Sequence, residues 1–117
     1  MSNKIIIKHK KYILSGNDFT FCVTDGSWFV SHWDIINNKN AKIDATCIFG
    51  IDGVELTLYE KQNGKNSAKE LVKKTISKYL EKNNPISGQF RFEFDGERFN
   101  LCKTKPKWAN YDCGILE

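Results

Sequence analysis

The sequence lacks most of the features that would reveal a protein's chemistry. Its 117 residues include only two prolines, two histidines and one methionine. There is no Gly-rich phosphate loop, no G-x-S-x-G and no H-E-x-x-H motif. No apolar run approaches the roughly 18 to 20 residues that cross a bilayer, and the N-terminal apolar stretch of about three residues is too short for a signal peptide. These absences predict a cytoplasmic protein that is not an enzyme and has no cofactor, metal or membrane partner.

The four cysteines, Cys22, Cys47, Cys102 and Cys113, show no zinc-binding spacing, because no two of them form C-x2-C or C-x4-C. Three lie in strand-like runs, where a free cysteine behaves as a small buried hydrophobic residue. The sequence therefore predicts free thiols, with a disulfide between two of them as the alternative.

Composition favours one folded domain spanning residues 1–117. The chain is 40% hydrophobic and 13% aromatic, which is ordinary for a globular protein. Its net charge of +4 is unevenly distributed, because residues 61–117 carry 12 basic and 7 acidic side chains. We therefore expect an anionic partner to meet the second half. The Lys-, Asn- and Ile-rich composition is compatible with a bacterial or phage origin.

Three Asp-Gly pairs, at 25–26, 52–53 and 95–96, separate runs of alternating apolar and polar residues. Such pairs are typical of two-residue hairpin turns, which need positive φ. The first turn would place Phe21 opposite Val30, with large apolar side chains on both faces of the hairpin.

The other two Asp-Gly turns predict hairpins of different character. The second would place Ile51 opposite Val54. The third would place Phe92 opposite Phe99 on an aromatic face, with a Glu93–Arg98 ion pair on the other. A further strand is predicted over residues 4–14, folding back at a turn over residues 15–18.

A helix is predicted over residues 67–83. Ser67 and Glu70 form a capping box, and Pro85 follows the end. Apolar residues recur on one stripe at Ala68, Leu71, Val72, Thr75, Ile76, Tyr79 and Leu80. The outer lysines are interpreted as a solvated surface with a Glu70–Lys74 pair.

Together these elements predict an α+β fold. It comprises an antiparallel meander of about five strands, one amphipathic helix and a C-terminal hairpin, with a curved sheet packed on the helix. Residues 103–117 are expected to form an extended tail that packs back on the domain.

The missing catalytic motifs favour a binding role. The leading hypothesis is a module that neutralises or regulates a partner protein, such as a toxin or enzyme, by steric occlusion, as bacterial toxin-immunity and inhibitor proteins do. An aromatic anchor inside a charged rim would make the contact, and Trp33 is the ring expected to be reachable. The candidate partner-binding residues are Trp33, Lys103, Lys105, Lys107, Trp108 and Tyr111.

Two other functions remain open. The basic second half could bind nucleic acid, with lysines along the phosphates and aromatic rings on the bases. A small enzyme could instead use His32 with a cysteine, if the fold brings them together.

Overall fold

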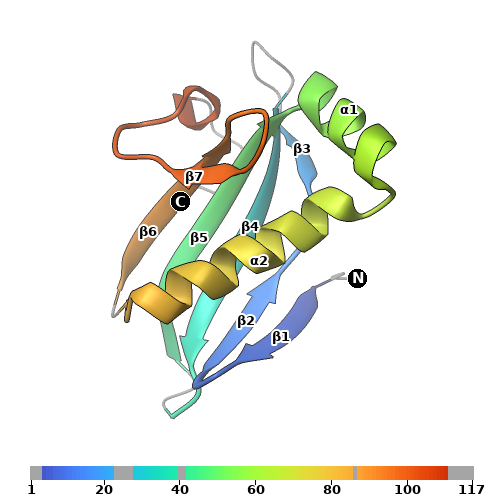
Figure 1. Cartoon of the computed structure of the whole chain (residues 1–117). Coiled ribbons are helices and arrows are strands. Elements are labelled where there is room, and N and C mark those ends of the chain that lie inside the picture. Colours follow the sequence, from blue (N-terminus) through green and yellow to red (C-terminus); the bar gives the residue numbers. More distant parts are fainter. Residues whose placement is uncertain (1–3, 23–27, 40–41, 86, 111–117) are drawn as a thin grey trace.

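A computed structural model of the chain describes residues 4–22, 28–39, 42–85 and 87–110 (Figure 1). The described part has an α+β fold with seven strands in one mixed sheet and two α-helices. The elements are β1 (Ile5–His9), β2 (Tyr12–Gly16), β3 (Thr20–Cys22), β4 (Trp28–Asn37), β5 (Lys42–Asp52), α1 (Gly53–Asn63), α2 (Ser67–Lys82), β6 (Gly88–Phe94), β7 (Phe99–Leu101) and the 3-10 helix η1 (Lys107–Asn110).

The sheet is not the purely antiparallel meander that the sequence predicted. Its strand order is β1-β2-β4-β5-β6-β7, and β3 also pairs with β4. Strands β5 and β6 run parallel, whereas the other pairs are antiparallel. The reason is that both helices lie between β5 and β6 in the chain, and a parallel pair needs such a long crossover.

The N-terminal hairpin turns earlier than predicted. It turns at Lys10 and Lys11, where Lys10 has φ 55. Ser15 and Gly16 instead belong to β2, and residues 17–19 form a break before β3. The two strands lie in succession along the same edge of β4. Asn17 bridges this break, because its side-chain oxygen accepts from the His32 amide at 3.1 Å and its carbonyl accepts from the Ser31 hydroxyl at 2.6 Å.

The Asp25-Gly26 turn lies outside the described residues, but the strands on either side of it pair antiparallel as predicted. Their register differs by one residue, since Phe21 lies opposite Phe29. The expectation that β4 is apolar on both faces is confirmed. Val30 and Trp33, which point to opposite sides of the sheet, are both buried.

The hairpin predicted at Asp52-Gly53 is wrong. Strand β5 runs through Asp52, and α1 begins at Gly53. The Asp52 side chain caps this helix by accepting from the Val54 amide at 2.8 Å. Aspartate serves helix N-caps as well as turns, so the same dipeptide fits both structures.

The third hairpin has the predicted aromatic face with a longer turn. Phe94 lies opposite Phe99, because the Asp95 side chain accepts from the amides of Glu97 and Arg98 and holds a wider turn. A shift of two positions keeps every side chain on its predicted face. The Glu93–Arg98 ion pair does not form, since Arg98 lies in the turn and pairs with Glu97 at 3.0 Å.

The predicted helix is confirmed as α2, and its buried residues are Ala68, Val72, Ile76 and Leu80. The prediction of a capping box at Ser67 and Glu70 is wrong. The N-cap is Asn66, in the left-handed conformation with φ 71, and Ser67 is already helical with its hydroxyl unpaired among the described residues. Glu70 pairs with Lys73 at 3.3 Å instead of with Lys74.

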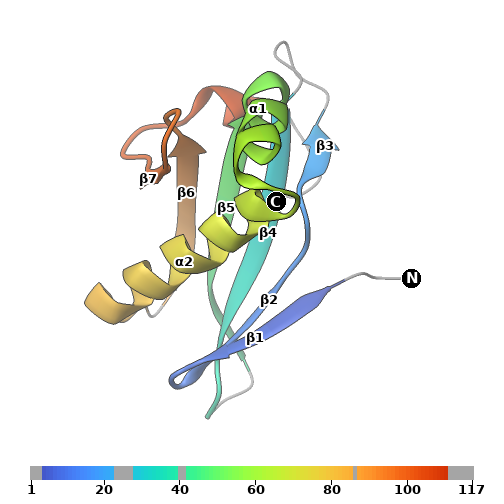
Figure 2. The ribbon, with the colours of Figure 1, turned by 45° about the vertical axis from the view of Figure 1, so that its right-hand side comes forward.

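The two faces of the sheet are covered differently. Both helices lie on one face, here called the helix side (Figure 2), where the main core includes Leu14, Trp33 and Phe49. On the opposite face, the far side, η1 packs Trp108 against Val30 in a smaller cluster. Among the described residues, no helix has both the length and the hydropathy that a membrane span requires.

Candidate basic groove on the helix side

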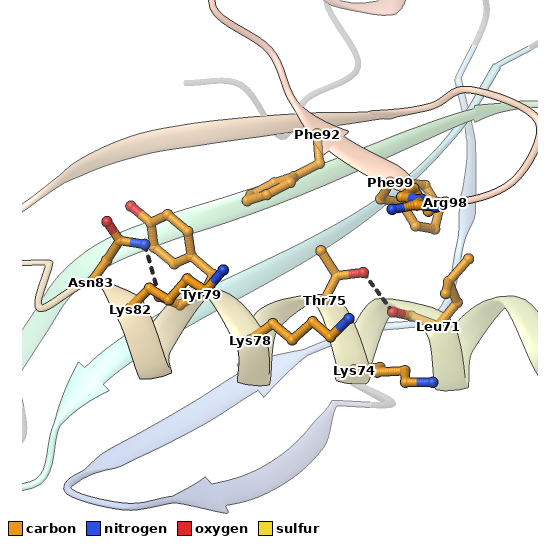
Figure 3. A pocket seen from close by; sticks show the side chains of 10 residues that line it. All are labelled: Leu71, Lys74, Thr75, Lys78, Tyr79, Lys82, Asn83, Phe92, Arg98 and Phe99. Carbon is orange, nitrogen blue, oxygen red and sulfur yellow. Dashed lines mark hydrogen bonds between the residues drawn. The ribbon is translucent and has the colours of Figure 1, made fainter.

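A hollow of about 460 Å³ lies between α2 and β7 on the helix side (Figure 3). Strand β7, the edge strand of the sheet beside β6, packs next to α2 across this hollow. The residues that line it are Leu71, Lys74, Thr75, Lys78, Tyr79, Lys82, Asn83, Phe92, Arg98 and Phe99. This hollow, called the basic groove below, combines an apolar floor with a cationic rim.

The cationic rim follows from the helical repeat. Lys74, Lys78 and Lys82 occur every four residues, so they form one row with an axial spacing of about 6 Å. All three side chains are exposed. In the described part of the chain none has an ion pair, whereas Lys73 is paired with Glu70. The row is therefore free to meet an anionic partner.

Arg98 completes the rim from the strand side of the groove. Its guanidinium forms an ion pair with Glu97, and both side chains are more than 60% exposed. Such an exposed pair contributes little to stability and can exchange with another carboxylate. Arg98 is held next to the groove because Asp95 organises the turn that precedes β7.

The floor of the groove is a rigid aromatic surface. Phe92 and Phe99 are both buried, and each packs on Phe49, with ring centroids 4.8 and 5.3 Å apart. Stacked and edge-to-face pairs of this kind add to the stabilisation from burial. These contacts hold both rings in place at the base of the groove.

Tyr79 forms one wall of the groove. Its ring lies 5.2 Å from Phe90 and 5.8 Å from Phe92, measured between centroids. Burial raises the pKa of the Tyr79 hydroxyl, and the nearby Cys47 adds to the shift. The hydroxyl is thus neutral at physiological pH, where it can both donate and accept a hydrogen bond.

Two of the predicted aromatic anchors are buried. Trp33 is 0% exposed, with its indole N–H donating to the Ser31 hydroxyl at 2.8 Å, so the expectation of a reachable ring is wrong. Trp108 is also 0% exposed. Both rings lie over strand glycines, Gly16 and Gly50, whose missing side chains leave room for an indole.

The predicted lysines are only partly placed. Lys103 and Lys105 are exposed and line a second hollow of about 250 Å³ with Arg91. The structure does not bring them to the basic groove. The side chain of Lys107 and all of Tyr111 lie outside the described residues.

Sequence reasoning missed the basic groove. The signal was present in the four-residue spacing of Lys74, Lys78 and Lys82, but such spacing is also typical of a solvated helix surface. The two interpretations differ in which segment of the chain lies beside the lysine row. The turn at Arg98 lies beside α2 only because the β6–β7 hairpin follows the helices and returns along the sheet.

The sheet separates His32 from Cys47. His32 Nε2 lies 3.2 Å from the Asp34 carboxylate on the far side, whereas Cys47 faces the helix-side core. They cannot form a dyad, because alternate positions of a strand point to opposite faces. Within the described ranges, no three His, Cys, Asp or Glu side chains gather as they would around a metal ion.

Cys47 and Cys102 are free thiols, as predicted. Burial raises the pKa of Cys47 to about 12. Burial also raises the pKa of Cys102, with Glu93 adding to the shift and Arg91 opposing it. Neither thiol is a thiolate at neutral pH, so neither is an activated nucleophile.

No protein-family model matches the chain, and no match was found among curated proteins or solved structures.

Proposed function

We propose that this protein binds a partner protein at the basic groove and thereby covers the partner's working surface, in the manner of toxin-neutralising immunity proteins and inhibitors. The observation that carries the proposal is the rim of Lys74, Lys78, Lys82 and Arg98 around an aromatic floor. A pocket with an apolar floor and a few oriented polar groups is the usual form of a recognition site.

The chemistry of the groove specifies the partner. An apolar side chain would enter between α2 and β7 and contact Phe92 and Phe99, while carboxylates around it would meet the lysine row. Charged rims of this kind speed association and select the partner, and the buried centre supplies most of the affinity. The anchor therefore belongs to the partner, because this chain's own large aromatic rings Trp33 and Trp108 are buried.

A peptide panel tests this proposal directly. Each peptide carries a central Phe flanked by Glu, Gln or Lys, and binding is measured by fluorescence anisotropy. We expect only the Glu-flanked peptide to bind, and charge reversal at Lys74→Glu with Lys78→Glu to weaken it by tenfold or more, equivalent to about 1.4 kcal/mol.

The matched control is Lys61→Glu with Lys65→Glu, which reverses two exposed charges that do not line the groove. This variant should bind nearly as well as the parent protein. Equal loss in both double variants would mean that net charge alone drives binding, and the proposal would fail.

Nucleic-acid binding is a second candidate, favoured by the exposed Lys103 and Lys105 next to Arg91. Binding driven by phosphate contacts weakens steeply as salt rises, and Lys103→Ala with Lys105→Ala should flatten that dependence. No retention of single- or double-stranded oligonucleotides at low salt would exclude this candidate.

A further inference from the structure

The second hollow lies where the chain leaves β7 and passes the end of β6. Its lining is Gln89, Arg91, Cys102, Lys103, Thr104 and Lys105. Strand alternation places Gln89 and Arg91 opposite the buried Phe92, so they point to the far side. The hollow is therefore separate from the basic groove, which opens on the helix side.

Three cations line this hollow, Arg91, Lys103 and Lys105, and its lining contains no acid. The nearest acidic position along β6 is Glu93, which lies opposite Asn100. In the described part of the chain, no ion pair joins Glu93 to any of these three cations. Glu93 lies close enough to Cys102 to raise the pKa of that thiol, so it offsets part of the repulsion among the cations, but no carboxylate of the described residues is ion-paired with any of the three.

Arg91 is held in place with donors to spare. Its Nη2 donates to the Gln89 side-chain oxygen at 2.7 Å, and the Arg91 carbonyl accepts from the Cys102 amide at 2.7 Å. Its Nε is shielded from solvent and has no partner among the described residues. A guanidinium has five N–H donors in a planar fork that matches the oxygens of phosphate or carboxylate.

We propose that this hollow binds a phosphate group. Arg91 supplies the fork, Lys103 and Lys105 supply charge, and the Thr104 hydroxyl supplies a neutral donor. A volume of about 250 Å³ accommodates the group together with water. The described lining has no aromatic ring on which a base could stack, so the hollow recognises the phosphate and leaves the attached group outside.

The test is a titration of the full chain with inorganic phosphate, followed by amide NMR. We expect saturable shifts at residues 91 and 102–105, and none when potassium chloride replaces phosphate at equal ionic strength. Arg91→Gln should weaken binding about tenfold, because charge-assisted bonds to the fork are lost. The double variant Lys103→Gln with Lys105→Gln should also weaken phosphate binding. Because both positions are exposed, this variant provides the test if Arg91→Gln disturbs folding.

The control is Lys61→Gln with Lys65→Gln, which removes the same charge elsewhere and should leave the titration unchanged. Shifts that rise without saturation, that chloride reproduces, or that survive the Arg91 and lysine substitutions would overturn the proposal. Peptide binding at the basic groove would be untouched by that result, since the two hollows share no residue.

A second arm identifies the source of the phosphate. A twelve-residue oligo-dT that displaces inorganic phosphate from the same amides would identify a nucleic-acid backbone. An oligo-dT that leaves these amides unchanged, while inorganic phosphate saturates them, would identify a small phosphorylated molecule. Either result supports the site.

Discussion

Two tryptophans lie on glycines on opposite faces of the sheet, and they are stabilised differently. On the helix side, Trp33 covers Gly16, its partner on the neighbouring strand, and its N–H is bonded to Ser31. On the far side, Trp108 covers Gly50 from a 3-10 helix, and its N–H has no partner among the described residues.

The difference shows how a buried aromatic ring depends on the element that carries it. Trp33 is part of β4, the central strand, so its position is set by hydrogen bonds to both neighbouring strands. Trp108 belongs to a short segment that follows the last strand. Burial of its indole holds this segment against the sheet. One ring is built into the sheet, and the other attaches a segment to it.

Truncation of each ring should produce the largest effect and so sharpen this comparison most. Trp33→Ala should lower the free energy of unfolding by about 3–5 kcal/mol, as expected for a large core truncation. Trp108→Ala should cost less, because the segment can leave the sheet and no enclosed cavity need remain. Urea unfolding of both variants measures the difference, and an equal or greater cost for Trp108→Ala would contradict it.

A smaller effect comes from filling the two glycine sites. A Cβ at Gly16 or Gly50 would overlap the covering indole, so each Gly→Ala variant should lose about 1–3 kcal/mol. On a Trp108→Ala background the cost of Gly50→Ala should vanish. The cost of Gly16→Ala should persist there, because Trp33 is still present.

This double-mutant cycle is evaluated from thermal or urea unfolding of the single and double variants. If the cost of Gly50→Ala is the same with and without the Trp108 ring, the two residues are not coupled and the segment packs elsewhere.

The smallest expected effect concerns Cys47 and Cys102, the thiols on the two faces of the sheet. The pKa of Cys47 is about 12 in the folded protein, above its ordinary value of 9.0. Between pH 9 and 12 the folded state thus keeps a proton that the unfolded state loses, so stability falls as pH rises, by about 1.4 kcal/mol per pH unit at most. Cys47→Ala should remove this component of the pH dependence.

The same comparison can be followed by alkylation. At pH 9 iodoacetamide should modify Cys102, which is partly exposed, well before Cys47, and mass spectrometry of the peptides separates the two. Rapid modification of Cys47 in the native protein would show that the helix-side core opens more easily than its packing implies.

The sequence predicted the local pieces where one pattern had one physical explanation. The apolar stripe over Ala68, Val72, Ile76 and Leu80 indicated α2 because only a helix brings those positions together. The alternation of Phe92 and Phe94 indicated a strand with one aromatic face. Free thiols at Cys47 and Cys102 followed from spacing and strand burial.

Where a pattern fits two structures, the prediction failed. Asp52-Gly53 fits both a hairpin turn and a helix N-cap, and residues 15–18 fit both a turn and the end of one strand followed by a break before the next. The competing structures differ in contacts with distant segments. Asn17, for example, is fixed by bonds to Ser31 and His32, which no local pattern reveals.

By itself, the sequence determined an α+β fold, the helix α2, the aromatic face of β6 and the basic charge of the second half. These follow from periodicity and composition, which are properties of neighbouring residues. Only the tertiary structure decided that Trp33 is inaccessible, that β5 and β6 are parallel, and that Arg98 meets the lysine row. Each of these depends on which distant segments pack together, because burial and charge clustering arise from neighbours in space.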